Sequence, residues 1–270
     1  MKKIDIVKLD WEERFGLPSA GGTSVGKLLP LLLGMAFTAV FYALLALFRL
    51  YWSNCVFLNM FFPGGPEMRT FIPGLTVYLS MSSLAMLLLK RSKLKIQQKA
   101  LAALPSSGNT AEKLVLLSEI FRDIDDFAAA VLMKKYLQLQ TDKLSALEIA
   151  GIMDSHFDDL EKECENSFIP VSCFIWAIPV LGFIGTVIGL AAAVGNFGEL
   201  TNSGSTVDFQ NILPQVTGGL ATAFETTLIA LTAALLLQII SSFQNQSELR
   251  WIMTAKKQIL DSNSVANGGE

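Results

Sequence analysis

Residues 168–194 read FIPVSCFIWAIPVLGFIGTVIGLAAAV and contain no charged side chain. A helix needs about 20 predominantly apolar residues to cross the hydrocarbon core of a membrane, so this run is long enough to span it and to tilt or project beyond it. Three more runs meet the same criterion, at residues 28–48, 71–89 and 212–243. The sequence therefore predicts an all-α membrane protein with four transmembrane helices.

The composition of the whole chain agrees with a membrane protein. Of its 270 residues, 51% are hydrophobic and 17% are charged, whereas about a quarter of the residues in a soluble domain are charged. The net charge of −3 argues against a nucleic-acid-binding protein, which usually has a basic surplus. Cys55, Cys164 and Cys173 form no CxxC pair, so the sequence predicts neither a zinc site nor a disulfide framework.

Basic residues beside the apolar runs predict the orientation of the chain, because lysine and arginine concentrate on the cytoplasmic side. Lys90, Arg91, Lys93, Lys95 and Lys99 directly follow the second run, whereas the loops at 49–70 and 196–211 carry few basic residues or none. We therefore expect both termini in the cytoplasm. The predicted organisation is a tail (1–27), two spans with an outer loop (28–89), a cytoplasmic helical segment (90–167), two further spans (168–243) and a second tail (244–270).

The cytoplasmic segment predicts amphipathic helices that pack on each other or on neighbouring subunits. Ser145 to Glu148 fits a capping box, which marks the start of a helix. No glycine or proline interrupts residues 152–169. We therefore expect the third transmembrane helix to extend into the cytoplasm as one long helix.

Small and hydroxyl-bearing residues form one stripe of the third run: Gly182, Thr186, Gly189 and Ala193. Gly185 and Gly189 also form a GxxxG pair, and small residues allow membrane helices to pack closely. Close packing alone explains the glycines about as well as a role in ion conduction does. Thr186 is more specific, because its hydroxyl can donate to a carbonyl or replace part of the hydration shell of an ion.

The fourth run carries a carboxylate among hydroxyls. Thr222, Glu225 and Thr226 lie at helical spacings i, i+3 and i+4, and Glu225 is the only acidic residue well inside a predicted span. A charge at the centre of a membrane helix costs about 2.5–3.5 kcal/mol on insertion scales. Glu225 is therefore either a hydrogen-bonded residue that ties helices together or part of an ion pathway, and the surrounding hydroxyls favour the pathway.

Two segments resemble those of the MotA/TolQ/ExbB proton channel family. PVLGFIGTVIGL at 179–190 is similar to the third-span motif of MotA and the second-span motif of ExbB and TolQ, and GGLATAFETTLIAL at 218–231 is similar to the final-span motif of the same proteins. The resemblance is specific within residues 168–243. Elsewhere the chain shares the layout of MotA, with four spans and a large inner segment between the second and third.

The resemblance implies a homopentamer in the inner membrane of a bacterium, arranged around two copies of a single-span MotB/ExbD/TolR-like protein. An aspartate in the span of that partner would be neutralised repeatedly by H⁺ or Na⁺, and the pentamer would rotate around it. By the same resemblance, Thr186 and Thr227 line the passage, Thr226 is an alternative to Thr227, and Pro179 is the proline that enters the span. The glutamate that ExbB-type proteins carry five residues before the second threonine is Thr222 here, and a glutamate stands at Glu225 instead.

Other functions have weaker support. Residues 21–27 approach a Walker A loop, but Leu28 follows where that motif needs Ser or Thr. We expect no catalytic site, no metal and no cofactor, and His156 is expected to be solvated or packed. The leading hypothesis is an ion-conducting stator-type motor subunit, of a flagellar, envelope, gliding or defence system. The alternatives are a non-conducting scaffold that recruits partners through its cytoplasmic helices, and a substrate transporter, which lacks the expected repeat halves.

Overall fold

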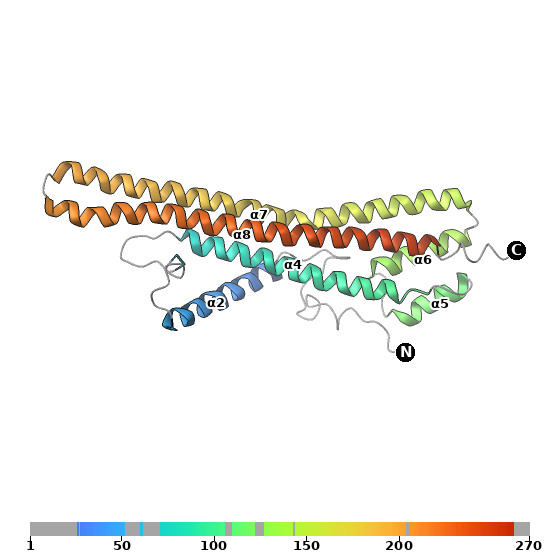
Figure 1. Ribbon diagram of the computed structural model, residues 1–270. Helices are drawn as coiled ribbons and strands as arrows, with labels where there is room; N and C mark the ends of the chain where they lie inside the picture. Colours follow the sequence, from blue (N-terminus) through green and yellow to red (C-terminus); the bar gives the residue numbers. More distant parts are fainter. Residues whose placement is uncertain are drawn as a thin grey trace. The chain divides into compact units, whose positions relative to one another are not determined.

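All regular structure in the described part of the chain is α-helical (Figure 1). The computed structural model describes residues 26, 28–51, 60–61, 71–105, 110–121, 127–142, 144–203 and 206–261. Its helices are α2 (Leu28–Tyr51), α4 (Ile72–Ala102), α5 (Thr110–Ile120), α6 (Ala128–Thr141), α7 (Ala146–Ser203) and α8 (Thr206–Asp261). The prediction of an all-α protein is confirmed.

Four of these helices, α2, α4, α7 and α8, are long and apolar enough to cross a membrane. Each contains one of the four apolar runs. The longest, α7, has 58 residues, which at 1.5 Å per residue corresponds to about 87 Å, roughly three times the thickness of the hydrocarbon core. A large part of α7 therefore extends beyond the bilayer.

The predicted continuation of the third span into one long helix is confirmed. α7 begins directly after the capping box, in which the Ser145 N–H donates to Glu148 Oε2 (2.9 Å) and the Glu148 N–H donates to Ser145 Oγ (3.3 Å). The helix continues through Pro170 and Pro179, although neither residue can donate the usual backbone hydrogen bond. Proline is more frequent in membrane helices than in soluble ones because neighbouring groups can satisfy the freed carbonyls.

The chain forms two compact units. We call residues 31–85 and 171–240 the apolar unit, and residues 1–30, 86–170 and 241–270 the charged unit. The three later boundaries fall within about four residues of the span ends expected from hydropathy at residues 89, 168 and 243. Packing and hydropathy, which are separate observations, thus divide the long helices at nearly the same places.

In the apolar unit, the helices pack through a close contact at a glycine and through one buried apolar cluster. α2 contacts α4 at Gly34, where a Cβ atom would overlap Ser82. Val77 of α4 and Ile229 of α8 form a buried cluster with Phe61. This cluster and the close contact at Gly34 connect α2, α4 and α8.

In the charged unit, α5 and α6 pack on each other through apolar side chains. The rings of Phe121 and Phe127, which flank the two helices, lie 4.9 Å apart between centroids, and Leu117 and Leu137 are fully buried. α8 contacts α4 through the Gln258 side-chain amide, which donates to the Leu101 carbonyl (3.1 Å).

Candidate functional site

Two helices of the apolar unit, α7 and α8, touch at backbone level along a row of glycines. A Cβ atom at Gly182 would lie 2.6 Å from the Ala230 Cβ, and one at Gly189 would lie 2.7 Å from the Gly219 carbonyl oxygen. Real side chains do not approach this closely, so any larger residue there must push the helices apart. We call this contact the glycine seam; its third α7 member, Gly185, packs on Thr226. Pro179 lies on α7 one turn before Gly182 and is half-buried.

Thr186 of α7 and Thr227 of α8 are hydrogen-bonded to each other across one edge of the seam. Thr186 Oγ1 also lies 3.2 Å from the carbonyl oxygens of Gly182 and Ala223, and Thr227 Oγ1 lies 3.2 Å and 3.1 Å from the same two acceptors. Each hydroxyl has one proton and two lone pairs. The pair therefore cannot make all of these bonds at once, and it can exchange donors by rotating its hydroxyl groups. Both residues are half-buried.

The other predicted pathway residues of α8, Thr222, Glu225 and Thr226, differ in burial. Thr226 is only 2% exposed and donates to the Thr222 carbonyl (3.0 Å). Thr222 and Glu225 are half-exposed. Successive helix residues are rotated by 100°, so Glu225 lies about 160° around α8 from Thr227. The carboxylate of Glu225 and the Thr186–Thr227 pair are thus on nearly opposite sides of α8.

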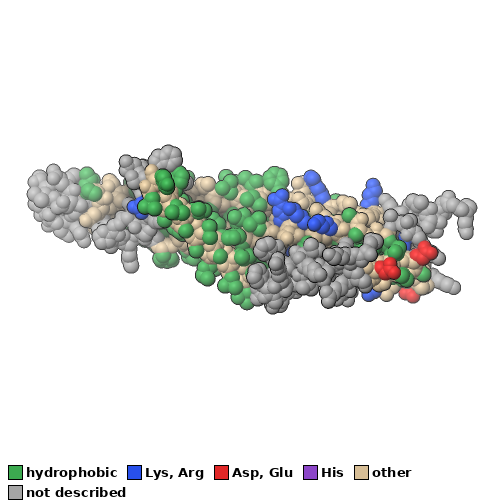
Figure 2. All heavy atoms as spheres, turned by 90° about the horizontal axis from the view of Figure 1, so that it is seen from below, with side chains coloured by type: hydrophobic (Ala, Val, Ile, Leu, Met, Phe, Trp, Pro, Cys, Tyr) green, Lys and Arg blue, Asp and Glu red, His purple; other side chains and the backbone are tan. Residues whose placement is uncertain are grey.

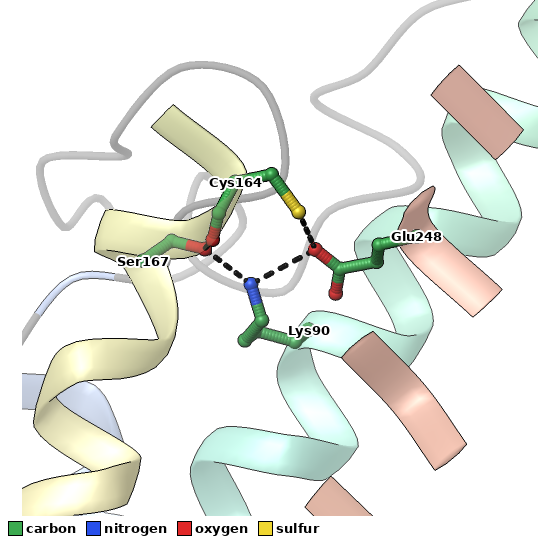
Figure 3. A network of polar contacts seen from close by, with 4 residues as sticks. All are labelled: Lys90, Cys164, Ser167 and Glu248. Carbon is green, nitrogen blue, oxygen red and sulfur yellow. Dashed lines mark hydrogen bonds and ion pairs between the residues drawn. The ribbon is translucent and has the colours of Figure 1, made fainter. Parts of the chain in front are cut away.

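A buried cluster of polar groups joins three helices of the charged unit (Figure 3). Lys90 Nζ of α4 lies 3.1 Å from Glu248 Oε2 of α8, and their side chains are 1% and 0% exposed. From α7, Ser167 Oγ accepts a hydrogen bond from the Lys90 ammonium (2.5 Å), and the Cys164 thiol donates to Glu248 Oε2 (3.1 Å). The ammonium also lies 4.0 Å from the centre of the Phe168 ring. We call Lys90, Cys164, Ser167 and Glu248 the buried cluster.

Burial shifts the ionisation of two members of this cluster. It lowers the pKa of Lys90 below its usual value, and the attraction of Glu248 opposes that shift. It raises the pKa of the Cys164 thiol to about 12, and the negative charge of Glu248 adds to this effect. Cys164 is therefore a neutral hydrogen-bond donor at neutral pH. The Glu248 carboxylate holds two donors on Oε2, whereas its buried Oε1 has no partner among the described residues.

Comparison with known proteins agrees with the motifs in α7 and α8. Residues 124–254 match the family model of the MotA/TolQ/ExbB proton channel family. This match covers just under half of the chain. The matched region contains the whole glycine seam and every candidate pathway residue, and it excludes α2 and α4. Neither a curated protein nor a solved structure matches the chain.

The family match confirms the resemblance seen in residues 179–190 and 218–231. Together with the four helices that are long and apolar enough to cross a membrane, it indicates a multi-pass membrane protein of the proton-channel, energy-transducing type. Within the described ranges, no three His, Cys, Asp or Glu side chains are grouped so that they could hold a metal ion.

The buried cluster was missed at the sequence level. Lys90 served there only to orient the chain, Cys164 was not assigned a role, and Glu248 was not considered. One signal in the sequence points to Glu248: it occupies a buried stripe of α8 in which the other members are uncharged (Gln244, Trp251, Ala255 and Ile259). A carboxylate in such a stripe needs a partner, but its partner, Lys90, is 158 positions away.

Proposed function

We propose that this protein is the ion-conducting subunit of a stator-type motor. It would couple the flow of H⁺ or Na⁺ down the membrane gradient to rotation with a single-span MotB/ExbD/TolR-like partner. The match to the proton channel family supports the class of function. The observation that carries the proposal to particular residues is the half-exposed Thr186–Thr227 pair at the edge of the glycine seam.

The chemistry of this pair suits a passing ion or an acidic side chain of the partner. Two hydroxyls that share alternative acceptors can donate to a carboxylate or turn their lone pairs towards a cation. Both groups are neutral, so they offer an ion favourable contacts without holding it tightly, as conduction requires. The backbone contact between α7 and α8 keeps the two hydroxyls together, because the helices have little space in which to shift.

The proposed assembly is a homopentamer around two copies of the partner, in the inner membrane of a bacterium with both chain termini in the cytoplasm. Large apolar side chains on α7 and α8 are exposed, among them Phe183, Val187, Phe224 and Leu228, which supports contact with lipid or with neighbouring copies. Thr222 and Glu225 form a second polar surface on the other side of α8 from the threonine pair. We assign that surface to a separate part of the ion pathway, whereas the burial of Thr226 supports a packing role.

Ion flux tests the proposal. We expect Thr227→Ala and Thr186→Val each to reduce H⁺ or Na⁺ flux at least about tenfold in vesicles that contain this chain and its single-span partner. Size-exclusion chromatography should show the same assembly as for the native chain. Thr38→Ala is the matched control, because the Thr38 hydroxyl donates only to Gly34 of its own helix (2.7 Å).

Unchanged flux in both seam variants would rule out the threonine pair as the pathway. If vesicles with the native chain and its partner conduct no more than empty vesicles, the chain is instead a non-conducting scaffold. Glu225→Gln separates the two roles of that residue: loss of flux with intact assembly indicates the pathway, and loss of assembly indicates a structural tie.

A further inference from the structure

Beyond its apolar run, α4 continues as a helix with one buried and one exposed face. Lys90 is on the buried face and is paired within the protein. Arg91, Lys95 and Lys99 are exposed, and their spacing of four residues places them along one side of the helix. We call these three residues the basic stripe. Figure 2 shows several Lys and Arg side chains on the face that it draws.

The same face of α4 changes from apolar to basic within one turn. Leu88, three residues before Arg91, is 48% exposed. This change matches the environment at the edge of a bilayer, where hydrocarbon gives way to headgroups about 5–8 Å thick on each side. The basic stripe is about 12 Å long. Arg91 and Lys95 therefore lie at headgroup depth, and the long side chain of Lys99 can bend back towards it.

The charges of the basic stripe are not neutralised by the described part of the protein. Lys90, Lys162 and Lys256 form ion pairs there, and none of the ion pairs described involves Arg91, Lys95 or Lys99. Exposed, unpaired cations next to an apolar helix face attract anionic lipids, and arginine can hold a phosphate with two parallel hydrogen bonds. We propose that the basic stripe binds the headgroups of anionic phospholipids and so fixes the depth of α4 in the membrane.

This inference does not depend on ion conduction. A cation near an anionic membrane surface strengthens binding about fivefold, so three of them favour an anionic over a zwitterionic lipid by about two orders of magnitude. Salt weakens such contacts because it screens exposed charges.

A lipid-binding titration tests the inference. The full chain in a neutral detergent is titrated with fluorescent phosphatidylglycerol or phosphatidylcholine. We expect the native chain to prefer phosphatidylglycerol, and the variant Arg91→Gln/Lys95→Gln/Lys99→Gln to bind it at least about tenfold more weakly. A native chain without this preference, or a variant that retains it, would overturn the inference.

Two further variants test whether the lipid preference comes from the basic stripe, rather than from net charge or from a change in folding. Lys134→Gln/Lys135→Gln/Lys257→Gln removes three positive charges far from the spans and should keep the preference. Arg91→Lys/Lys95→Arg/Lys99→Arg keeps the charges of the stripe and should also keep it, with an unchanged circular dichroism spectrum. If the glutamine variant binds phosphatidylglycerol normally but loses binding to polyglutamate, the stripe is a protein-binding surface and the inference is wrong.

Discussion

At the residue scale, Lys90 and Glu248 form a buried ion pair. Both groups lose their water, and their mutual attraction only partly offsets that cost. Two hydrogen bonds from α7 support the pair. Ser167 Oγ accepts one from Lys90 (2.5 Å), and the Cys164 thiol donates one to Glu248 (3.1 Å). Removing one charge leaves the other buried without compensation, so each residue depends strongly on the other.

We expect Lys90→Met and Glu248→Met each to reduce the free energy of unfolding by about 3–5 kcal/mol, and the double variant to recover most of that loss. Chemical denaturation in detergent measures all three as a double-mutant cycle. Lys256→Met is the control, since the Lys256–Asp154 pair (2.9 Å) is half-exposed and should contribute about 0–1 kcal/mol. Additive losses in the double variant would show that the two residues act independently.

Cys164 should react slowly with alkylating reagents, because burial raises the pKa of its thiol to about 12 and only the thiolate reacts. In a Cys55→Ala/Cys173→Ala background, mass spectrometry should show labelling that increases with pH up to about 12 and accelerates on denaturation. The ordinary pKa of a cysteine thiol, 9.0, decides how this shift changes stability with pH. Above pH 9 the unfolded thiol ionises while the folded one stays protonated, so this group lowers stability as pH rises. Fast labelling of the native protein at pH 7 would contradict this account.

At the scale of elements, glycines have opposite effects in different parts of α7. In the glycine seam they allow backbone contact with α8. At Gly151, in the charged unit, a Cβ atom would meet nothing within 4 Å. The same substitution therefore tests packing at one site and helix propensity at the other.

We expect Gly189→Val to separate α7 from α8 and to lower the thermal midpoint, since its Cβ would overlap the Gly219 carbonyl and the Ala223 side chain. Gly151→Ala on the same helix should instead stabilise the protein by up to about 1 kcal/mol, because alanine is the better helix former. Thermal denaturation followed by circular dichroism measures both effects. Equal behaviour of the two variants would mean that the seam is not closely packed.

At the scale of the whole molecule, the division into an apolar and a charged unit bears on topology. The charged unit contains residues 86–102 of α4, 146–170 of α7 and 241–261 of α8. Most of the lysines and arginines that predict the cytoplasmic side belong to these segments. We therefore expect the charged unit in the cytoplasm.

Reporter fusions check this topology. We expect green fluorescent protein fused after residue 270 to fluoresce, and alkaline phosphatase inserted near residue 60 or 200 to be active outside. The expectation follows because residues 49–70 and 196–211 carry few basic residues or none. The second stretch was predicted to be a loop, but α7 and α8 occupy all of it except residues 204–205. An active phosphatase at the C-terminus would reverse the orientation and move the basic stripe to the outer surface.

The sequence by itself determined the membrane class, the four spans, the start of α7 and the family. Each of these depends on local patterns: the length of an apolar run, the Ser145–Glu148 cap, or the motifs at 179–190 and 218–231. Residue periodicity also placed Gly182, Thr186, Gly189 and Ala193 on one stripe of α7, since one helical repeat applies along a whole element.

Only the tertiary structure decided which polar groups meet. It joined Thr186 to Thr227 across the seam and buried Thr226. It also brought together Lys90 and Glu248, which are 158 positions apart. Such contacts depend on the register and rotation of packed helices, and a pattern within one segment does not specify which residue of a distant segment lies opposite.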